Sequence, residues 1–133
     1  MALIRLAQPM ANMVMEETLT LEDLKKACNH GWDDVKAVVL FGSRARGDAR
    51  PQADWDLGII YESDRPEPEF SPTGDWDLFL WSEKRWEDGF ALQVEIAKDA
   101  VILLDPEGKL QERFEKIREY ILPHWAGYLK KMG

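Results

Sequence analysis

The sequence predicts an α/β domain in which a small mixed sheet is flanked by helices. Two observations carry this prediction: residues 35–41 and 55–61 are apolar runs of strand length, and stretches with helical spacing lie before and after them. The chain has 133 residues, which suits one domain better than two. We expect a single domain over residues 1–133, with a core at about 20–105 and a helical tail over 107–133.

The N-terminal part is expected to contain one regular helix. Residues 1–17 show no clear period, so we expect a short helix or a partner-facing arm there. Thr20 can begin the helix, because its hydroxyl can cap the first turn and two acids follow it. This helix is expected to include Cys28 on its apolar face and to end at Gly31.

Strands and helices are then expected to alternate. The expected strands are residues 35–41, 55–61, 76–81 and 101–104. A short helix over 44–48 follows the first strand, and the Pro-rich, acidic stretch 62–74 is expected to be a loop. Ser82 can cap a helical stretch that Gly89 divides in two. A tail helix is expected from Lys109, bent or broken at Pro123.

Composition excludes several classes of protein. The net charge is −8, so the surface as a whole does not offer the basic footprint of a nucleic-acid-binding protein. Cys28 is the one cysteine, which excludes an intramolecular disulfide and a cysteine metal site. The chain shows no signal peptide and no apolar run of membrane-spanning length, so we expect a soluble, cytoplasmic protein without membrane association.

The chemistry of the chain is concentrated around the first two strands. The strand ending at Phe41 is followed by Gly42-Ser43, and the next strand opens on Asp54 and Asp56. Because side chains alternate along a strand, both carboxylates project to the same side. Paired hard oxygen ligands suit Mg²⁺, and a Gly-Ser turn offers free N–H groups and a hydroxyl to a phosphate. Together these features indicate phosphoryl or nucleotidyl transfer.

The same motif resembles that of a known superfamily. Gly42-Ser43, ten intervening residues and Asp54-x-Asp56 are similar to the signature of the DNA polymerase β-like nucleotidyltransferases. The motif Gly-Ser-Arg-Ala-Arg-Gly is most similar to that of the minimal nucleotidyltransferase (MNT) domains, and the resemblance covers roughly residues 35–105. It implies the polymerase β-like nucleotidyltransferase fold.

The resemblance also implies the ligands of the metal. Asp54 and Asp56 would bind two Mg²⁺ ions that clamp the triphosphate of ATP, the substrate. The third carboxylate of the family lies on a later strand before an apolar run, which Asp77 matches, and this residue would also act as general base. Asp75 lies two residues earlier on the same face, so the choice between the two is open, with Asp77 favoured.

Phosphate contacts are implied for the turn. Gly42 and Ser43 would hold the terminal phosphates, and Arg44 or Arg46 would offset their charge. Arg44 is favoured because it lies nearer the turn. Where many relatives carry a serine before the first aspartate, this chain has Ala53, which removes a hydroxyl but no metal ligand.

The short length of the chain bears on the acceptor. Only about thirty residues follow the last expected strand, so we expect the acceptor to arrive on another chain. MNT domains of this size are commonly paired with an all-helical HEPN toxin, and the resemblance implies an antitoxin that transfers AMP to a toxin tyrosine. Two alternatives stay open: a small-molecule, aminoglycoside-like adenylyltransferase and a non-catalytic antitoxin that masks its toxin sterically. The resemblance leaves homo-oligomers and hetero-oligomers open as well.

Overall fold

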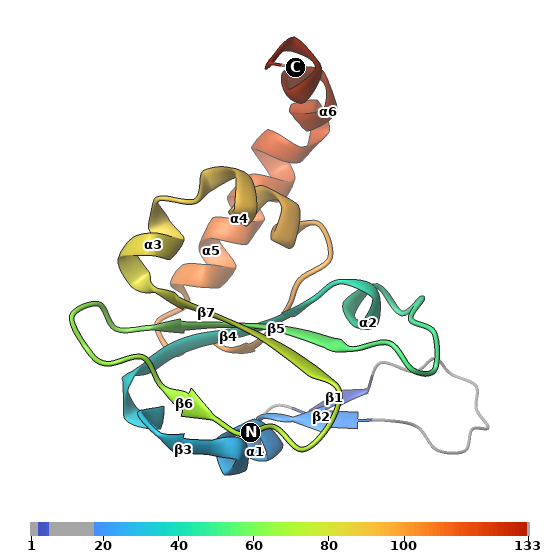
Figure 1. Cartoon of the computed structure of the whole chain (residues 1–133). Coiled ribbons are helices and arrows are strands. Elements are labelled where there is room, and N and C mark those ends of the chain that lie inside the picture. The colour runs from blue at the N-terminus through green and yellow to red at the C-terminus, as the bar shows by residue number, and fades with distance from the viewer. Residues whose placement is uncertain (1–2, 6–17, 133) are drawn as a thin grey trace.

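The computed structural model describes residues 3–5 and 18–132. Its centre is a four-stranded sheet in the order β7-β5-β4-β8 (Figure 1). The strands are β4 (Val35–Phe41), β5 (Trp55–Tyr61), β7 (Trp76–Ser82) and β8 (Val101–Leu104). β4 runs antiparallel to both β5 and β8, whereas β5 and β7 are parallel. The mixed sheet confirms the predicted fold class, and all four strands lie where the apolar runs predicted them.

Two smaller sheets lie below the central sheet in Figure 1. One pairs β1 (Leu3–Arg5) with β2 (Thr18–Thr20), and the other pairs β3 (Cys28–His30) with β6 (Glu69–Phe70). β1 is the described part of the segment for which we expected a helix or an arm, and the rest of that segment lies outside the described residues.

The first helix, α1 (Leu21–Ala27), is shorter than expected. Its start is confirmed, because Thr20 and Asp23 cap each other's backbone N–H groups in a capping box. The expectation that Cys28 belongs to this helix was wrong, since Cys28 is extended and pairs with Phe70 of β6. This pairing joins segments distant in sequence, which local helical spacing cannot reveal. The stretch 62–74 was expected to be a loop but contains β6, because this short strand also forms by pairing with residues distant in sequence.

The helices that follow β7 lie on the other side of the central sheet (Figure 1). They are α3 (Glu83–Glu87), α4 (Phe90–Ala97), α5 (Lys109–Lys116), the π-helical segment η2 (Ile117–Ile121) and α6 (Leu122–Met132). The Ser82 cap on α3 and the division at Gly89 are confirmed. Of the predicted bend or break at Pro123, the break was wrong, because the helix continues through this residue. The backbone hydrogen bonds take π-helical spacing over Ile117–Ile121, directly before the proline.

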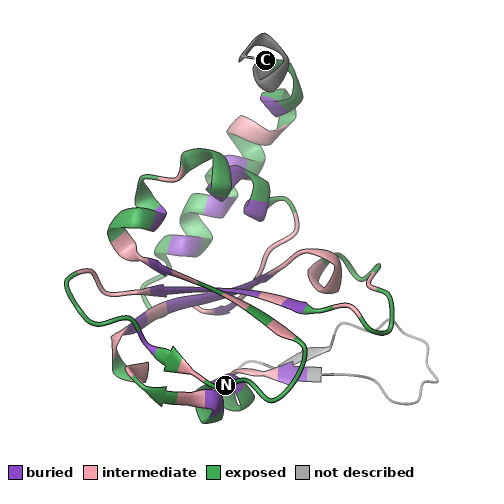
Figure 2. Cartoon of the chain, in the orientation of Figure 1, coloured by how far each residue is buried: buried purple, intermediate pink, exposed green. Residues whose placement is uncertain are grey.

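Each face of the central sheet has its own apolar core. On the face covered by α3–α6, which we call the helical face, Val39, Ile60 and Trp81 pack with residues of the helices. On the opposite face, Leu40 and Leu57 pack with residues that include those of α1 and β6. Figure 2 shows the buried residues concentrated along the middle strands β4 and β5.

Two short elements complete the described chain: the 3₁₀ helix η1 (Trp32–Asp34) before β4 and the four-residue helix α2 (Ser43–Arg46) after it. None of the helices in the described ranges has both the length and the apolar character needed to cross a bilayer.

Candidate active site

The parallel pairing of β5 and β7 places two of the predicted carboxylates next to each other. Asp56 lies in register with Asp77, and laterally paired residues in a sheet project to the same face. That face is the helical face, because Ile60 and Trp81, which share the alternation of Asp56 and Asp77, pack into the core beneath α3–α6. The aspartates lie at the other end of these strands, so they stay accessible.

Asp54 lies two residues before Asp56, just outside β5, and is exposed. Its charge acts on Asp56 together with that of Asp77. Among the described residues, no three acidic, histidine or cysteine side chains converge closely enough to enclose a metal ion. The pair of Asp56 and Asp77 is therefore the compact part of the site, and Asp54 stands beside it.

The Gly-Ser turn lies directly against this pair. Phe41 of β4 is in register with Asp56, and the next residue, Gly42, has a φ of 81°, which favours glycine. A Cβ on Gly42 would collide with the Oδ2 atom of Asp56. The absence of a side chain therefore lets the turn and the carboxylate approach each other. Ser43, half-buried, begins α2 at this point.

The two arginines of the motif lie in different surroundings. The Arg44 guanidinium donates to the carbonyls of Ala53 at 2.8 Å and Pro51 at 3.3 Å. It also lies 4.7 Å from the ring centroid of Trp55, which belongs to the core on the opposite face. These contacts attach α2 to the start of β5, and they turn Arg44 away from the side on which Asp56 projects.

Arg46 lies on the acidic side of the site. Its guanidinium contacts Asp48 at 3.2 Å and Asp99 at 3.4 Å, and these two carboxylates raise its pKa. Its charge lowers the pKa of Asp56. Of the two predicted phosphate contacts, Arg46 is therefore the one whose charge reaches the carboxylates, whereas the sequence favoured Arg44.

Electrostatics within the site act mainly on Asp56. Burial against its neighbours raises the pKa of this carboxyl, the negative charges of Asp77 and Asp54 raise it further, and Arg46 opposes the rise. A bound cation would relieve both causes, because it replaces lost hydration and cancels the repulsion. The site therefore favours a positively charged ligand.

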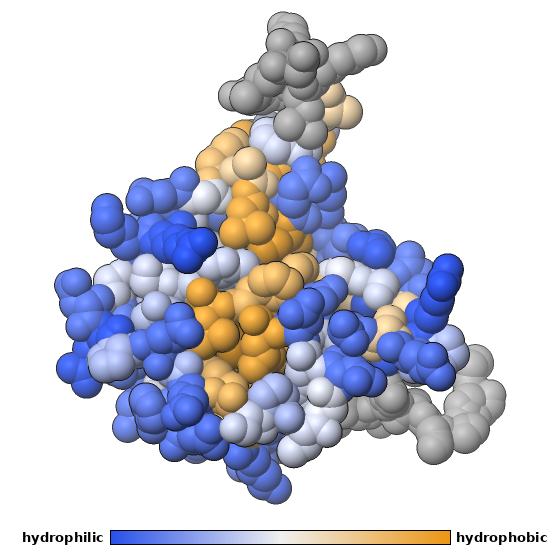
Figure 3. Space-filling view, viewed as in Figure 1, coloured by the Kyte–Doolittle hydropathy of each residue, from blue (hydrophilic) through white to orange (hydrophobic). Residues whose placement is uncertain are grey.

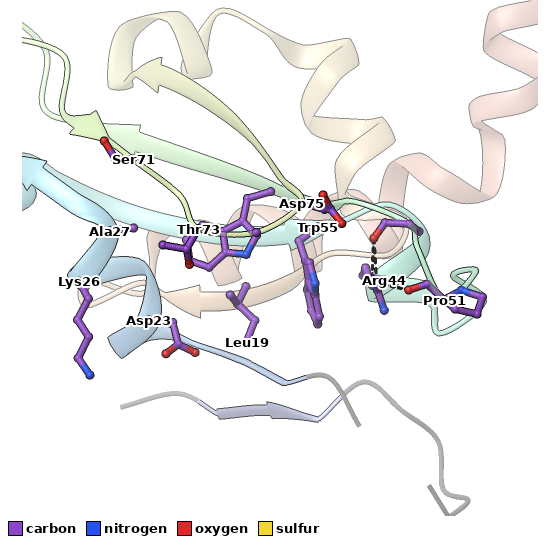
Figure 4. A pocket seen from close by; sticks show the side chains of 13 residues that line it. Leu19, Asp23, Lys26, Ala27, Arg44, Pro51, Trp55, Ser71, Thr73 and Asp75 are labelled. Atoms are coloured by element: carbon purple, nitrogen blue, oxygen red, sulfur yellow. Dashed lines mark hydrogen bonds between the residues drawn. The ribbon is translucent and has the colours of Figure 1, made fainter. Parts of the chain in front are cut away.

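A pocket of about 570 Å³ lies on the opposite side of the sheet (Figure 4). Trp55 projects into it beside Leu19, and Arg44 and Lys26 also line it. Asp75 is another lining residue, and its carbonyl accepts a hydrogen bond from the Trp55 N–H at 2.8 Å. Of the two candidates for the third carboxylate, Asp77 is in register with Asp56, whereas Asp75 precedes β7.

Aromatic residues continue the helical face beyond the carboxylates. The rings of Phe41 and Phe79 lie 5.5 Å apart, and that of Trp81 lies 6.1 Å from Phe79. Phe79 follows Asp77 by two residues and is 37% exposed, so it offers an aromatic surface beside the site. The sequence reasoning did not single out Phe79, although the alternation that pairs Asp54 with Asp56 also places Phe79 on the face of Asp77.

The donor set fits Mg²⁺. Carboxylate oxygens are its preferred protein ligands, and Mg²⁺ in phosphate-transferring sites is held by one or two carboxylates together with substrate phosphates and water. Asp56 and Asp77 supply that pair, and the space left by Gly42 keeps the Asp56 oxygen accessible from the turn. The charge of Asp54 also acts on Asp56, so this third carboxylate lies near the pair.

Comparison with known proteins connects this geometry to a family. The model of a family described as "Nucleotidyltransferase domain" matches residues 21–124. The matched region begins at α1, contains the turn and all three carboxylates, and ends at the start of α6. A search of curated proteins found no match to the chain.

Proposed function

The chain belongs to the nucleotidyltransferase domain family, and from this premise we propose that it transfers AMP from ATP to a hydroxyl of a protein partner. One observation carries the proposal: Asp56 and Asp77 lie in register on one face, directly against the Gly42 turn. A carboxylate pair for Mg²⁺ and a turn suited to phosphates are thereby adjacent, as nucleotidyl transfer requires.

Mg²⁺ ions held by Asp54, Asp56 and Asp77 would supply positive charge to the triphosphate and to the phosphorus under attack. Ser43 and the Gly42 backbone would hold the terminal phosphates, and Arg46 would offset their charge. Asp77 would accept the proton of the attacking hydroxyl. The hydroxyl oxygen then bonds to the α-phosphorus, the bond from that phosphorus to the bridging oxygen of the β-phosphate breaks, and pyrophosphate leaves.

The acceptor is proposed to be a tyrosine of a HEPN-type helical toxin, so that the chain acts as an antitoxin. This part rests on the resemblance to MNT domains. The described residues after β8 form a helical tail of α5, η2 and α6 that packs on the central sheet.

The test is transfer of radioactivity from ATP labelled at the α-phosphate, with Mg²⁺, to proteins co-purified with the chain. We expect one labelled partner band that is missing with the Asp54→Asn protein. A band that persists in this variant would contradict catalysis by the carboxylates.

Toxin neutralisation provides a second readout. Neutralisation that disappears with Asp54→Asn supports catalysis, whereas neutralisation that survives supports steric masking. Binding of ATP and Mg²⁺ without any labelled protein would redirect the search to small hydroxyl-bearing acceptors.

A further inference from the structure

We propose that the outer edge of β7 is the docking site of the acceptor protein, which adds an extended, tyrosine-bearing segment to β7 as an antiparallel strand. This inference rests on the proposed function, because it concerns the acceptor of that reaction. The observation behind it is that Asp77 lies on the edge strand of the sheet. The residue proposed to receive the acceptor proton is thus on a strand whose outer side pairs with no other strand of the described residues.

The backbone of β7 is available for pairing. In a β-strand, the N–H and C=O groups of one residue point to the same side, and those of the next residue point to the other side. The Asp75 carbonyl points to β5, because it accepts from the Trp55 N–H at 2.8 Å. Odd-numbered residues of β7 therefore face β5, and the backbone groups of Leu78 and Leu80 face outward. Among the described residues, no strand pairs with this side.

The strand also lacks the features that usually protect an edge. Natural edge strands are commonly short, bulged, or interrupted by proline or lysine. β7 is seven residues long, contains neither proline nor lysine, and stays in unbroken register with β5. Asp77 is its one charged residue. Such an edge is suited to strand addition.

Apolar side chains lie on both sides of this edge. Leu78 and Leu80 line a groove of about 680 Å³ together with Phe70 and Trp76, and Phe79 is exposed on the helical face. Figure 3 shows an orange band down the middle of the molecule, over α4 and β7, with blue surface on both sides. An added strand would place alternate side chains in the groove and beside Phe79.

Charge identifies the kind of occupant. Glu67 and Glu69 line the groove, Asp75 and Asp77 lie at the beginning of β7, and Glu83 follows its end. A second copy of the chain would bring the same acids and another net charge of −8 to this edge. An occupant with an apolar centre and lysine or arginine flanks complements it instead.

The register places the tyrosine beside Phe79. Because Phe79 directs its backbone groups to β5, the residue opposite it in an added antiparallel strand forms a non-hydrogen-bonded pair, with the side chains close together. The two rings then pack against each other, and the position of Asp77 is diagonal to the tyrosine, about 7–8 Å away and within reach of its hydroxyl. There the phenol oxygen bonds to the α-phosphorus of ATP, pyrophosphate leaves, and the phenol proton passes to Asp77.

The probe is a synthetic peptide, Lys-Lys-Thr-Val-Tyr-Val-Thr-Lys-Lys, used with the full chain. Its two valines would face the outward backbone groups of Leu78 and Leu80, whereas its two threonines would direct their N–H groups away from β7. Methylating both valine nitrogens should weaken binding at least about tenfold, because two hydrogen bonds are lost. Methylating both threonine nitrogens is the matched control, and we expect a change of less than about twofold.

Binding and chemistry are measured separately, so that the two proposals can fail separately. Fluorescence polarisation of the labelled peptide reports docking, and transfer of radioactivity from ATP labelled at the α-phosphate reports catalysis. Docking with the predicted methylation pattern but no transfer would count against the proposed function and leave the docking site intact. Absence of docking, or equal binding of both methylated peptides, would overturn the docking site.

A protein variant tests the same edge from the other side. Leu80→Pro removes an outward N–H and no bond to β5, so the sheet should tolerate it better than a proline at Phe79. We expect it to lose peptide binding while ATP and Mg²⁺ still bind. Tyr120→Ala, at a 66% exposed aromatic of the helical tail, is the control and should bind the peptide normally. A dimer of the chain that Leu80→Pro dissociates would assign the edge to a second copy and overturn the proposal.

Discussion

The two faces of the central sheet use the same strands for different purposes. On β5, Asp56 projects to the helical face and Leu57 to the opposite face, although they are neighbours in sequence. Leu57 is completely buried, whereas the Asp56 carboxyl is half-buried and repelled by Asp54 and Asp77. At this end of the sheet, one face thus stabilises the fold and the other carries charges that the fold alone does not need. Substitutions on the two faces should therefore separate activity from stability.

The largest effect is expected at the third carboxylate. Asp77→Asn should reduce nucleotidyl transfer about 1000-fold, because loss of a metal ligand and general base removes several kcal/mol of transition-state stabilisation. Asp75→Asn is the matched control and should change the rate less than about threefold. The rates are measured with labelled ATP at saturating Mg²⁺. The reverse ranking would move the third carboxylate to Asp75.

The opposite face should give the converse result. Leu57→Ala removes a fully buried side chain and should lower the free energy of unfolding by about 3 kcal/mol. Urea denaturation followed by tryptophan fluorescence measures this loss. The transfer rate per folded molecule should stay unchanged, and a rate that falls with stability intact would show that the two faces are coupled.

The turn offers a comparison between two glycines. Gly42 and Gly47 both have positive φ, 81° and 85°, so alanine strains the backbone at either position. Only at Gly42 would the added Cβ collide with Asp56, since nothing lies within 4 Å of the corresponding position at Gly47. We expect Gly42→Ala to lose about 10- to 100-fold in transfer rate and Gly47→Ala to lose stability alone. Equal rates for the two variants would argue against a tight turn at the site.

Substitutions of the two arginines should likewise affect activity at one position and stability at the other. Arg46→Gln is expected to raise the KM for ATP about fivefold, because the variant loses charge attraction to the phosphates, with little change in stability. Arg44→Gln should instead lower the free energy of unfolding by about 2 kcal/mol, because it loses the Trp55 stacking and hydrogen bonds to backbone carbonyls. Steady-state kinetics measures the KM of both variants, and urea denaturation measures their free energies of unfolding.

The smallest effect is expected on the pH dependence of stability in the absence of metal. The folded protein raises the pKa of Asp56 above 3.8, its ordinary value, so the protonated carboxyl stabilises the fold at acid pH. That contribution is lost as pH rises from 3.8 through the raised pKa. Asp56→Asn should remove this loss, so that in EDTA its melting temperature exceeds that of the unaltered protein more at pH 7 than at acid pH. A constant difference across pH would contradict a raised pKa of Asp56.

Local sequence was sufficient for the four strands of the central sheet and for the beginnings of several helices. The apolar runs predicted the bounds of β4 and β5. Capping chemistry at Thr20 and Ser82 likewise acts within one turn of a helix. These features depend on neighbours in the chain, so one sequence contains the information that determines them.

Tertiary structure decided the features that depend on residues distant in sequence. Cys28 lies outside α1 because it pairs with Phe70. Arg44 contacts the Trp55 ring and the carbonyls of the following loop. The register of β7 against β5 set Asp77 beside Asp56, and the strand order left β7 at the edge. Spacing along the chain specifies which way a side chain points from its own strand, but not which strand lies next to it, because that depends on packing of the whole domain.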